Sequence, residues 1–271
     1  MKPFFFLFTV IFVLAFLSGC KENKSGIVIP EKVEKYPTAL NTEWEYETTT
    51  YIAKYDKNGN LGMDSLAWPT SYSVVRITSV NDSVYGEKNL IRFDFGSNQE
   101  YSTGTHWYRN SERTFEMIAY SGLERDWVTP IKRKSNKLAF LKYLSNNLLP
   151  NGALFSTKDS TYLFKKTVLE YPLTVGNSWD IYIAKDFLIT KTIVEKKQLL
   201  FNGKSIECFD IKSIYNSAQD LDIHDYISLD YGLVKRETIA DSMEVTTTEF
   251  PNGTGEFLRY KSTSNLIRKS N

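Results

Sequence analysis

Cysteine is nearly absent from this chain. Its 271 residues include two cysteines, Cys20 and Cys208. A framework of disulfide bonds needs several cysteine pairs and is therefore excluded. Cys208 lies in the strand-like segment 205–211, SIECFDI, where we expect it to pack as a small hydrophobic residue. No histidine lies near it in the sequence, so nothing marks it as a reactive thiol.

The chain also lacks an excess of charge of either sign. It has 33 basic and 32 acidic residues, and because Lys2 is the one charged residue among the first 19, the remainder has 33 − 1 = 32 basic residues against 32 acidic. A balanced surface without a basic stripe gives no electrostatic reason to bind nucleic acid. We therefore predict no nucleic-acid partner.

Motifs that carry known chemistry are missing as well. The sequence has no Gly-x-Ser-x-Gly, no His-Glu-x-x-His and no glycine loop of the phosphate-binding or nucleotide-binding kind. We name no catalytic residue and no cofactor, and favour a protein that is not an enzyme. A hydrolase with paired carboxylates stays open, because Glu43, Glu45 and Glu47 share one face of an expected strand. Such a stripe is more often the solvent side of a sheet.

Histidine is equally scarce, with His106 and His224 the two in the chain. Asp220, Asp222 and His224 alternate and would project from one face of a strand, which makes them weak candidates for holding a cation. The central glycine and terminal acid of a helix-loop-helix calcium site are missing here. Polar residues before a strand are normally solvated, so we expect no metal.

A long apolar run occurs at the start of the chain. It extends from Phe4 to Leu17, interrupted by Thr9, and Lys2 precedes it. A helix needs about 20 apolar residues to cross a bilayer, so this run is too short to span one. A positive start, a short apolar region and small residues after it are typical of a secretory signal.

The end of that signal is Leu17-Ser18-Gly19-Cys20, which resembles the lipobox of bacterial lipoproteins. The resemblance implies removal of residues 1–19, a diacylglycerol on the Cys20 thiol and acylation of its new amino group. Several acyl chains on one residue anchor a protein stably to a membrane. Lys21 stands where retention signals for the inner membrane usually carry aspartate, so the resemblance favours the outer membrane. Residues 20–35 would form a polar tether.

Aromatic residues, by contrast, are abundant, with 17 Tyr, 17 Phe and 5 Trp, and this composition is typical of half-buried strands. Apolar and polar residues alternate around Trp44 and Tyr46 and again over 91–95. The Asn-Gly pairs at 202–203 and 252–253 lie between such runs and predict hairpin turns. We predict an all-β, mostly antiparallel fold in the form of a curved sheet, sandwich or barrel, with at most one short helix near 137–148.

Three pairs of segments resemble each other in the same order along the chain. Their offsets are 135, 116 and 118 residues, and the pairs are 36–44 with 171–179, 90–95 with 206–211, and 106–108 with 224–226. An insertion of about twenty residues near 56–71 in the first copy would explain the change of offset. The pattern predicts two related β units, 36–170 and 171–271, which could form one continuous domain. Chance likeness between β-rich segments is the alternative.

The segment 171–179, YPLTVGNSW, followed by 231–235, YGLVK, is similar to a group of uncharacterised β-rich envelope lipoproteins. The resemblance covers about the last hundred residues and implies a fold but no activity.

These observations favour a lipid-anchored, non-catalytic protein of the cell envelope. It would bind a hydrophobic or glycan ligand, or another envelope protein, on an aromatic face of its sheet. The candidate binding residues are Tyr46, Trp107, Tyr108 and Tyr226. The alternatives are a structural subunit that assembles through a strand edge or flat face, and the carboxylate hydrolase.

Overall fold

The structure is a computed structural model that describes residues 33–56, 58–97, 100–122, 161–184, 187–215, 221–244 and 256–270. These residues belong to one compact unit that extends from Val33 to Asn271. The regular elements are β1 (Glu43–Tyr55), β2 (Leu61–Val84), β3 (Glu87–Ser97), β4 (Glu100–Asn110), β5 (Thr114–Gly122), β6 (Thr161–Glu170), β7 (Ser178–Ala184), β8 (Phe187–Phe201), β9 (Lys204–Tyr215), β10 (Leu221–Ser228), β11 (Gly232–Glu244) and β12 (Phe257–Ser270).

The prediction of an all-β fold is confirmed for these residues, which contain no helix. The expected helix near 137–148 and the Asn252-Gly253 turn lie outside the described residues. Within the described ranges, no helix has the length and apolar character needed to cross a membrane.

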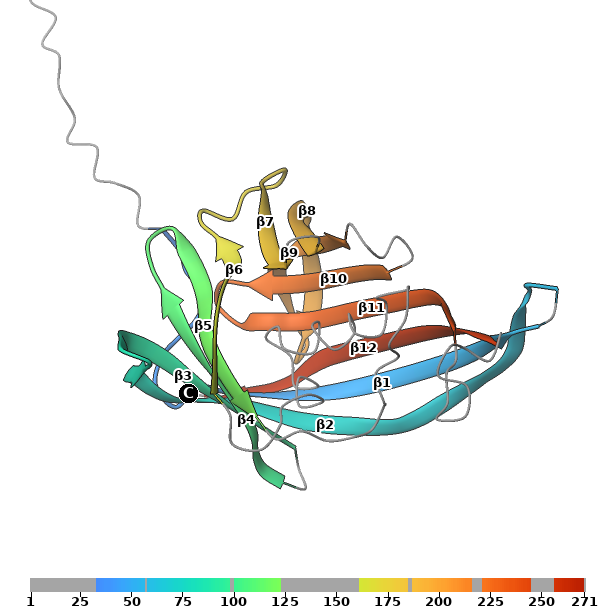
Figure 1. Cartoon of the computed structure of the whole chain (residues 1–271), viewed down its shortest axis with the longest axis horizontal. Coiled ribbons are helices and arrows are strands. Elements are labelled where there is room, and N and C mark those ends of the chain that lie inside the picture. The colour runs from blue at the N-terminus through green and yellow to red at the C-terminus, as the bar shows by residue number, and fades with distance from the viewer. Residues whose placement is uncertain are drawn as a thin grey trace, which may run out of the picture. The chain divides into compact units, whose positions relative to one another are not determined.

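All twelve strands join one antiparallel sheet, in the spatial order β6-β5-β4-β3-β2-β1-β12-β11-β10-β9-β8-β7. Strands β1 to β6 form one meander and β7 to β12 another, and the pairing of β1 with β12 joins them. The sheet curls until it is nearly closed into a barrel (Figure 1). Because alternate side chains of a strand point to opposite faces, the curl places one face of every strand on the inside.

The inner face carries an aromatic core at the positions that alternation predicts. Trp44 and Tyr46 on β1 are both buried, while Glu43, Glu45 and Glu47, which alternate with them, are partly exposed. Tyr36, just before β1, stacks on Phe115 of β5 with ring centroids 4.9 Å apart, and Tyr108 of β4 stacks on the same ring at 4.8 Å. These contacts join the segment before β1 to the β4–β5 hairpin.

The two meanders share local geometry at positions that the sequence comparison pairs. The matched segments fall on the starts of β1 and β7, on β3 and β9, and on β4 and β10. Asn41 and Gly176 both have positive φ, 66° and 91°, and each donates its backbone N–H to an isoleucine carbonyl, Ile77 at 3.0 Å and Ile193 at 2.8 Å. These parallels support a duplication, which itself stays a prediction.

Tight turns whose residues have positive φ connect the strands of two hairpins. Asn202 and Gly203, with φ of 50° and 75°, connect β8 to β9 as the sequence predicts, and Tyr85 and Gly86, with φ of 51° and 81°, connect β2 to β3. Successive positive φ values suit the twist of paired strands. Gly232 at the start of β11 also has a positive φ, 82°.

We expect the substitution Gly232→Ala to destabilise the protein strongly. A Cβ atom there would meet the Tyr36 hydroxyl at 2.8 Å, and that oxygen accepts the Leu233 amide at 3.2 Å. Strain from positive φ and the clash should together lower the free energy of unfolding by more than about 1 kcal/mol. Urea unfolding checks this, with Gly203→Ala as the control, because its φ is also positive but nothing lies within 4 Å. Equal losses in both variants would contradict the role of the clash.

Candidate functional site

Three of the four aromatic candidates, Tyr46, Tyr108 and Tyr226, belong to the main core cluster. Tyr46 and Tyr108 are both fully buried, and the Tyr46 hydroxyl donates to the Leu233 carbonyl at 2.9 Å. The ring of Tyr108 also meets Phe93 edge-on at 4.7 Å. Contacts of this kind favour a structural role for both tyrosines.

Trp107 lies apart from the other three, and both Trp107 and Tyr226 have polar partners. Trp107 belongs to a separate small cluster with Leu90 and Ile118, and its indole N–H donates to Asp82 at 2.9 Å. The Tyr226 hydroxyl donates to Glu237 at 2.9 Å, and two lysine ammonium groups lie over its ring. The fold therefore does not bring the four predicted residues together into one site.

The two weak metal candidates that the structure describes contact other side chains. Asp222 lies 2.8 Å from the Lys212 ammonium, and His224 Nδ1 lies 2.6 Å from the buried carboxylate of Asp210. Asp220 lies outside the described residues. In the part of the chain that the structure describes, no three carboxylate, histidine or cysteine side chains are grouped to hold a metal ion.

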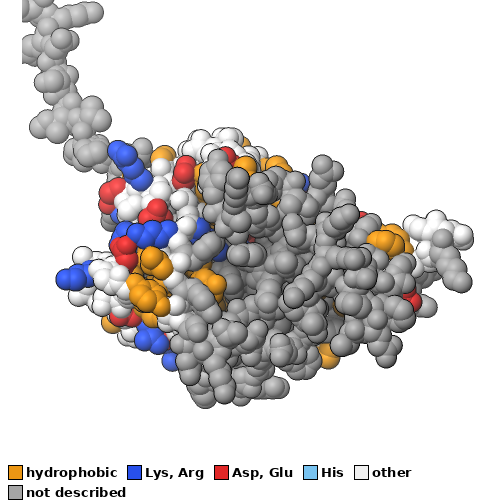
Figure 2. All heavy atoms as spheres, in the orientation of Figure 1, with side chains coloured by type: hydrophobic (Ala, Val, Ile, Leu, Met, Phe, Trp, Pro, Cys, Tyr) orange, Lys and Arg blue, Asp and Glu red, His pale blue; other side chains and the backbone are white. Residues whose placement is uncertain are grey.

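The glutamate stripe of β1 faces basic and hydroxyl groups. Arg268 of β12 reaches the Glu43 and Glu45 carboxylates, each at 2.8 Å, and the Tyr72 hydroxyl donates to Glu47 at 2.8 Å. These are contacts of a partly solvated outer face. Acidic and basic side chains also lie side by side on the described surface seen in Figure 2.

Sequence reasoning missed a group of charged side chains on the inner face, which we call the inner charge cluster: Lys166, Lys191, Asp225 and Arg236. Their exposed fractions are 6%, 3%, 2% and 3%. Two cations share the Asp225 carboxylate: Arg236 binds it through Nε and through Nη2 at 2.8 Å, and the Lys191 ammonium lies 3.7 Å away.

The curl of the sheet assembles this cluster. Lys166 comes from β6 at one end of the strand order, Lys191 from β8 near the other end, and Asp225 and Arg236 are paired partners on β10 and β11. Burial, reinforced by the charges of Lys191 and Arg236, holds the pKa of Lys166 well below its usual value. In an uncurled sheet, side chains on β6 and β8 would be too far apart for such an influence.

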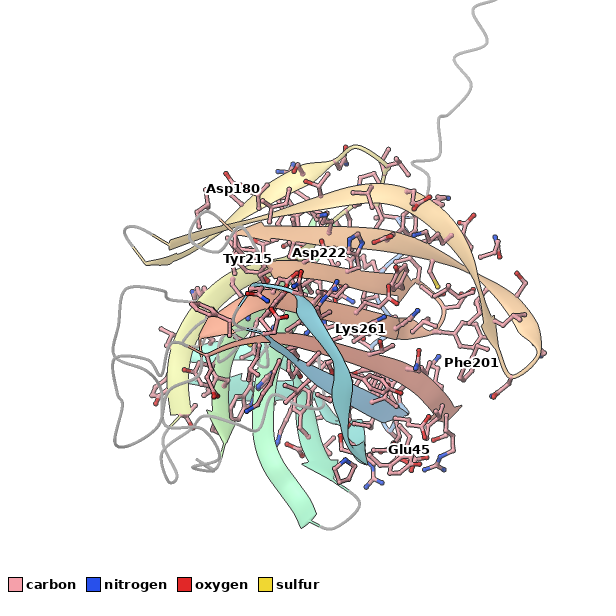
Figure 3. All side chains as sticks on the ribbon, turned by 90° about the vertical axis from the view of Figure 1, so that its right-hand side faces the viewer. Glu45, Asp180, Phe201, Tyr215, Asp222 and Lys261 are labelled. Atoms are coloured by element: carbon pink, nitrogen blue, oxygen red, sulfur yellow. The ribbon has the colours of Figure 1, made fainter. Side chains whose placement is uncertain are left out.

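Burial and the charges of the cluster shift the pKa values of its own members and of a nearby tyrosine. Burial tends to raise the pKa of Asp225, but the charges of Arg236 and Lys191 outweigh it, so this pKa lies below its usual value. Burial lowers the pKa of Lys191 more than the nearby Asp225 charge raises it. Burial raises the pKa of Tyr215 of β9, which is labelled in Figure 3. The charges of Arg236 and Asp225 also influence this pKa, in opposite directions.

Hydroxyl groups continue the polar inner surface on neighbouring strands. Ser213 of β9 is the register partner of Lys191, and Ser264 of β12 is the register partner of Arg236. The Ser264 hydroxyl is 2.8 Å from that of Thr48 on β1, and all three hydroxyl side chains are buried. A polar strip therefore crosses the inside of the sheet from β8 to β1, with a shift of two residues between β9 and β10, where Asp225 is in register with Ile211 and Ser213 with Ile223.

One feature of the sequence does point to the cluster. Lys191 has the same parity as Ile189 and Ile193, which are buried, and Asp225 has the same parity as Ile223 and Ile227. A charged residue on the apolar face of a strand is expensive to bury without compensation. Such positions are therefore candidates for function that alternation alone can identify.

Fold and site together define an all-β protein whose single curled sheet encloses a buried charge cluster. No protein-family model matches the chain, and no curated protein matches it. Two crystal structures are similar in fold. One is of a protein from Bacteroides fragilis described as exported, with a YmcC-like fold (12% identity, TM-score 0.40, 88% of this chain and 100% of that one). The other is of a protein from Parabacteroides distasonis described as a lipoprotein (11% identity, TM-score 0.36, 87% and 97%). Likeness at this level carries no argument about function.

Proposed function

We propose that this chain is a lipid-anchored, non-catalytic protein of the cell envelope that binds a ligand on the inner face of its curled sheet. The inner charge cluster carries this proposal, because burying charged groups is costly and contributes little to stability, which makes such groups candidates for function. The proposed binding face is the polar strip that runs from β8 to β1, in place of the aromatic candidates.

The proposed organisation follows the sequence. Residues 1–19 are a signal that is removed, Cys20 carries the lipid, and residues 20–35 are a tether to the outer membrane. Residues 36–170 and 171–271 are then the two related halves of one domain, each contributing one meander to the shared sheet.

Cys20→Ser should abolish lipid attachment. An alkyne-tagged fatty acid fed to the expressing bacterium should label the natural protein and Cys208→Ser equally, while Cys20→Ser remains unlabelled and keeps residues 1–19. Cys208 is a matched control because it is the other cysteine of the chain and lies buried in the sheet, where burial raises the pKa of its thiol to about 12. Label on the Cys20→Ser protein would refute the anchor.

Native mass spectrometry tests ligand binding directly. The full processed protein, released from membranes in a mild detergent, should carry an extra mass that disappears on denaturation. The bare mass of the lipidated polypeptide would count against a bound ligand and in favour of a partner protein.

A structural subunit is the second candidate function, and one observation favours it. Leu40 and Val175 occupy equivalent positions in the two matched segments, and each side chain is 48% exposed. Apolar side chains repeated at one surface position suit contact with a partner. Cross-links to an envelope protein that are lost in Leu40→Glu and Val175→Glu, with stability unchanged, would support this function.

A further inference from the structure

Three turns of the sheet carry exposed apolar side chains, which we call the apolar rim: Leu40, Val175 and Leu200. Leu40 lies just before β1, Val175 lies between β6 and β7, and Leu200 is the second-last residue of β8, next to the β8–β9 turn. The exposed fractions of these side chains are 48%, 48% and 81%. Single apolar residues are common on protein surfaces, so the three carry meaning only through a shared location.

Tyr36 holds two of these turns together. Its backbone N–H donates to the Tyr171 hydroxyl at 2.9 Å, and the Tyr171 N–H donates to the Arg113 carbonyl in the β4–β5 turn at 2.8 Å. Val175 follows Tyr171 by four residues, and Leu40 follows Tyr36 by four residues. The segments that carry Leu40 and Val175 are therefore fixed to the same tyrosine.

A chain of aromatic contacts connects Tyr36 to the third turn. The ring centroids of Tyr36 and Trp44 are 6.2 Å apart, and the Trp44 indole N–H donates to the Tyr231 carbonyl at 2.7 Å. The Tyr231 ring in turn meets the ring of Phe201 edge-on at 5.4 Å. Phe201, labelled in Figure 3, ends β8 and follows Leu200 directly. All three apolar side chains therefore lie at the same end of the curled sheet.

The chain from Cys20 enters the sheet at this end. Val33 packs against the core cluster, and Lys35 pairs with Glu112 in the β4–β5 turn. The 33 − 20 = 13 residues from Cys20 to Val33 can span at most about 45 Å. A lipid on Cys20 therefore keeps this end within that distance of the bilayer, while the opposite end of β1, a strand of 13 residues, can lie about 40 Å farther away.

We infer that the apolar rim rests in the surface of the membrane, with the side chains of Leu40, Val175 and Leu200 among the lipids. The inference rests on the lipid anchor of the proposed function, and adds a second membrane contact and an orientation. The Lys269 ammonium lies over the Tyr231 ring at 5.6 Å, and side chains with an apolar body and a polar tip suit a membrane interface. The proximity that the anchor imposes favours lipid over a protein partner at these residues.

The experiment uses the full processed, lipidated protein in vesicles of phosphatidylethanolamine and phosphatidylglycerol. The fluorophore nitrobenzoxadiazole is attached to the new thiol of Leu40→Cys, Val175→Cys or Leu200→Cys, since Cys20 is acylated and Cys208 is buried. The matched control is Ile214→Cys. Ile214 is 52% exposed and lies on β9, 214 − 204 = 10 residues or about 33 Å from the rim end of that strand. A nitroxide-labelled lipid and aqueous iodide are the two quenchers.

The nitroxide lipid should lower the fluorescence at positions 40, 175 and 200 at least about twofold, because interfacial apolar groups lie within about 10 Å of the lipid head groups. Iodide should quench the label at position 214 and leave the three rim labels nearly unchanged. Adding Leu200→Glu should weaken the nitroxide quenching at position 40, because a carboxylate is costly to place among lipid chains. Adding Ile214→Glu should leave that quenching unchanged.

Equal quenching at position 214 and at the rim would overturn the inference. Protection of the rim from iodide without quenching by the nitroxide lipid would overturn it as well, because a second copy of the chain would then cover the rim. Flotation with the vesicles separates this inference from the proposed anchor. Protein that floats while iodide quenches its rim labels refutes the inference and leaves the anchor in place, whereas protein that does not float refutes the anchor and the inference with it.

Discussion

Asp225→Asn should lower the free energy of unfolding by about 3–5 kcal/mol, the usual loss when one partner of a buried ion pair is removed. The substitution keeps the shape of the side chain but leaves Arg236 and Lys191, both nearly inaccessible to water, without the carboxylate that they share. The cations would then repel each other in a medium that screens them poorly. Guanidinium unfolding of the full processed protein at pH 7 measures the loss.

Asp222→Asn is the matched control for this change. It makes the same chemical substitution on the same strand, but the Asp222 side chain is 46% exposed and pairs with the partly exposed Lys212, so its loss should stay below about 1 kcal/mol. In the double variant Asp225→Asn with Lys191→Met, part of the stability should return, because one unpaired cation is gone. Losses of similar size at positions 222 and 225 would show that Asp225 does not hold the cluster together.

The all-β fold could be predicted because its determinants are local. Alternation around Trp44 and Tyr46 identifies a half-buried strand, and the Asn202-Gly203 pair identifies a hairpin, without knowledge of any distant residue. Since successive strands of each meander pair with their neighbours, local patterns also determine most of the strand order. The pairing of β1 with β12 joins the two ends of the described chain and has no local pattern of its own.

The candidate site could not be predicted because its members meet only through the curl of the sheet. Lys166 and Arg236 are far apart in sequence and lie on strands that the order of the sheet separates. The aromatic candidates rest on composition, which does not distinguish a binding face from a core, and Tyr46, Tyr108 and Tyr226 lie in the core. Charged residues on an apolar parity, such as Lys191, are the better indicator, because burial of their charge requires compensation.

Stability should fall steeply below pH 6.5 because of His106. Burial, with a smaller contribution from Lys166, lowers the pKa of His106 to about 3, and its Nδ1 lies 3.0 Å from the Tyr108 hydroxyl. The unfolded chain, in which the histidine has a pKa near 6.5, takes up a proton between these two pH values that the folded protein excludes. The linked loss of unfolding free energy is complete near pH 3 and amounts to about 5 kcal/mol, at about 1.4 kcal/mol per pKa unit.

His106→Gln should remove this component of the pH dependence. Chemical unfolding at several pH values between 7 and 4 gives the free energy of unfolding for the natural protein and for the variant, and the difference between the two should shrink by about 3 kcal/mol over that interval. Acidic residues titrate in both proteins, so their contribution cancels in the difference. His224→Gln changes the other histidine, which is partly exposed, and should keep the steep loss. Parallel curves for the natural protein and His106→Gln would mean that the buried ring is protonated in the folded protein.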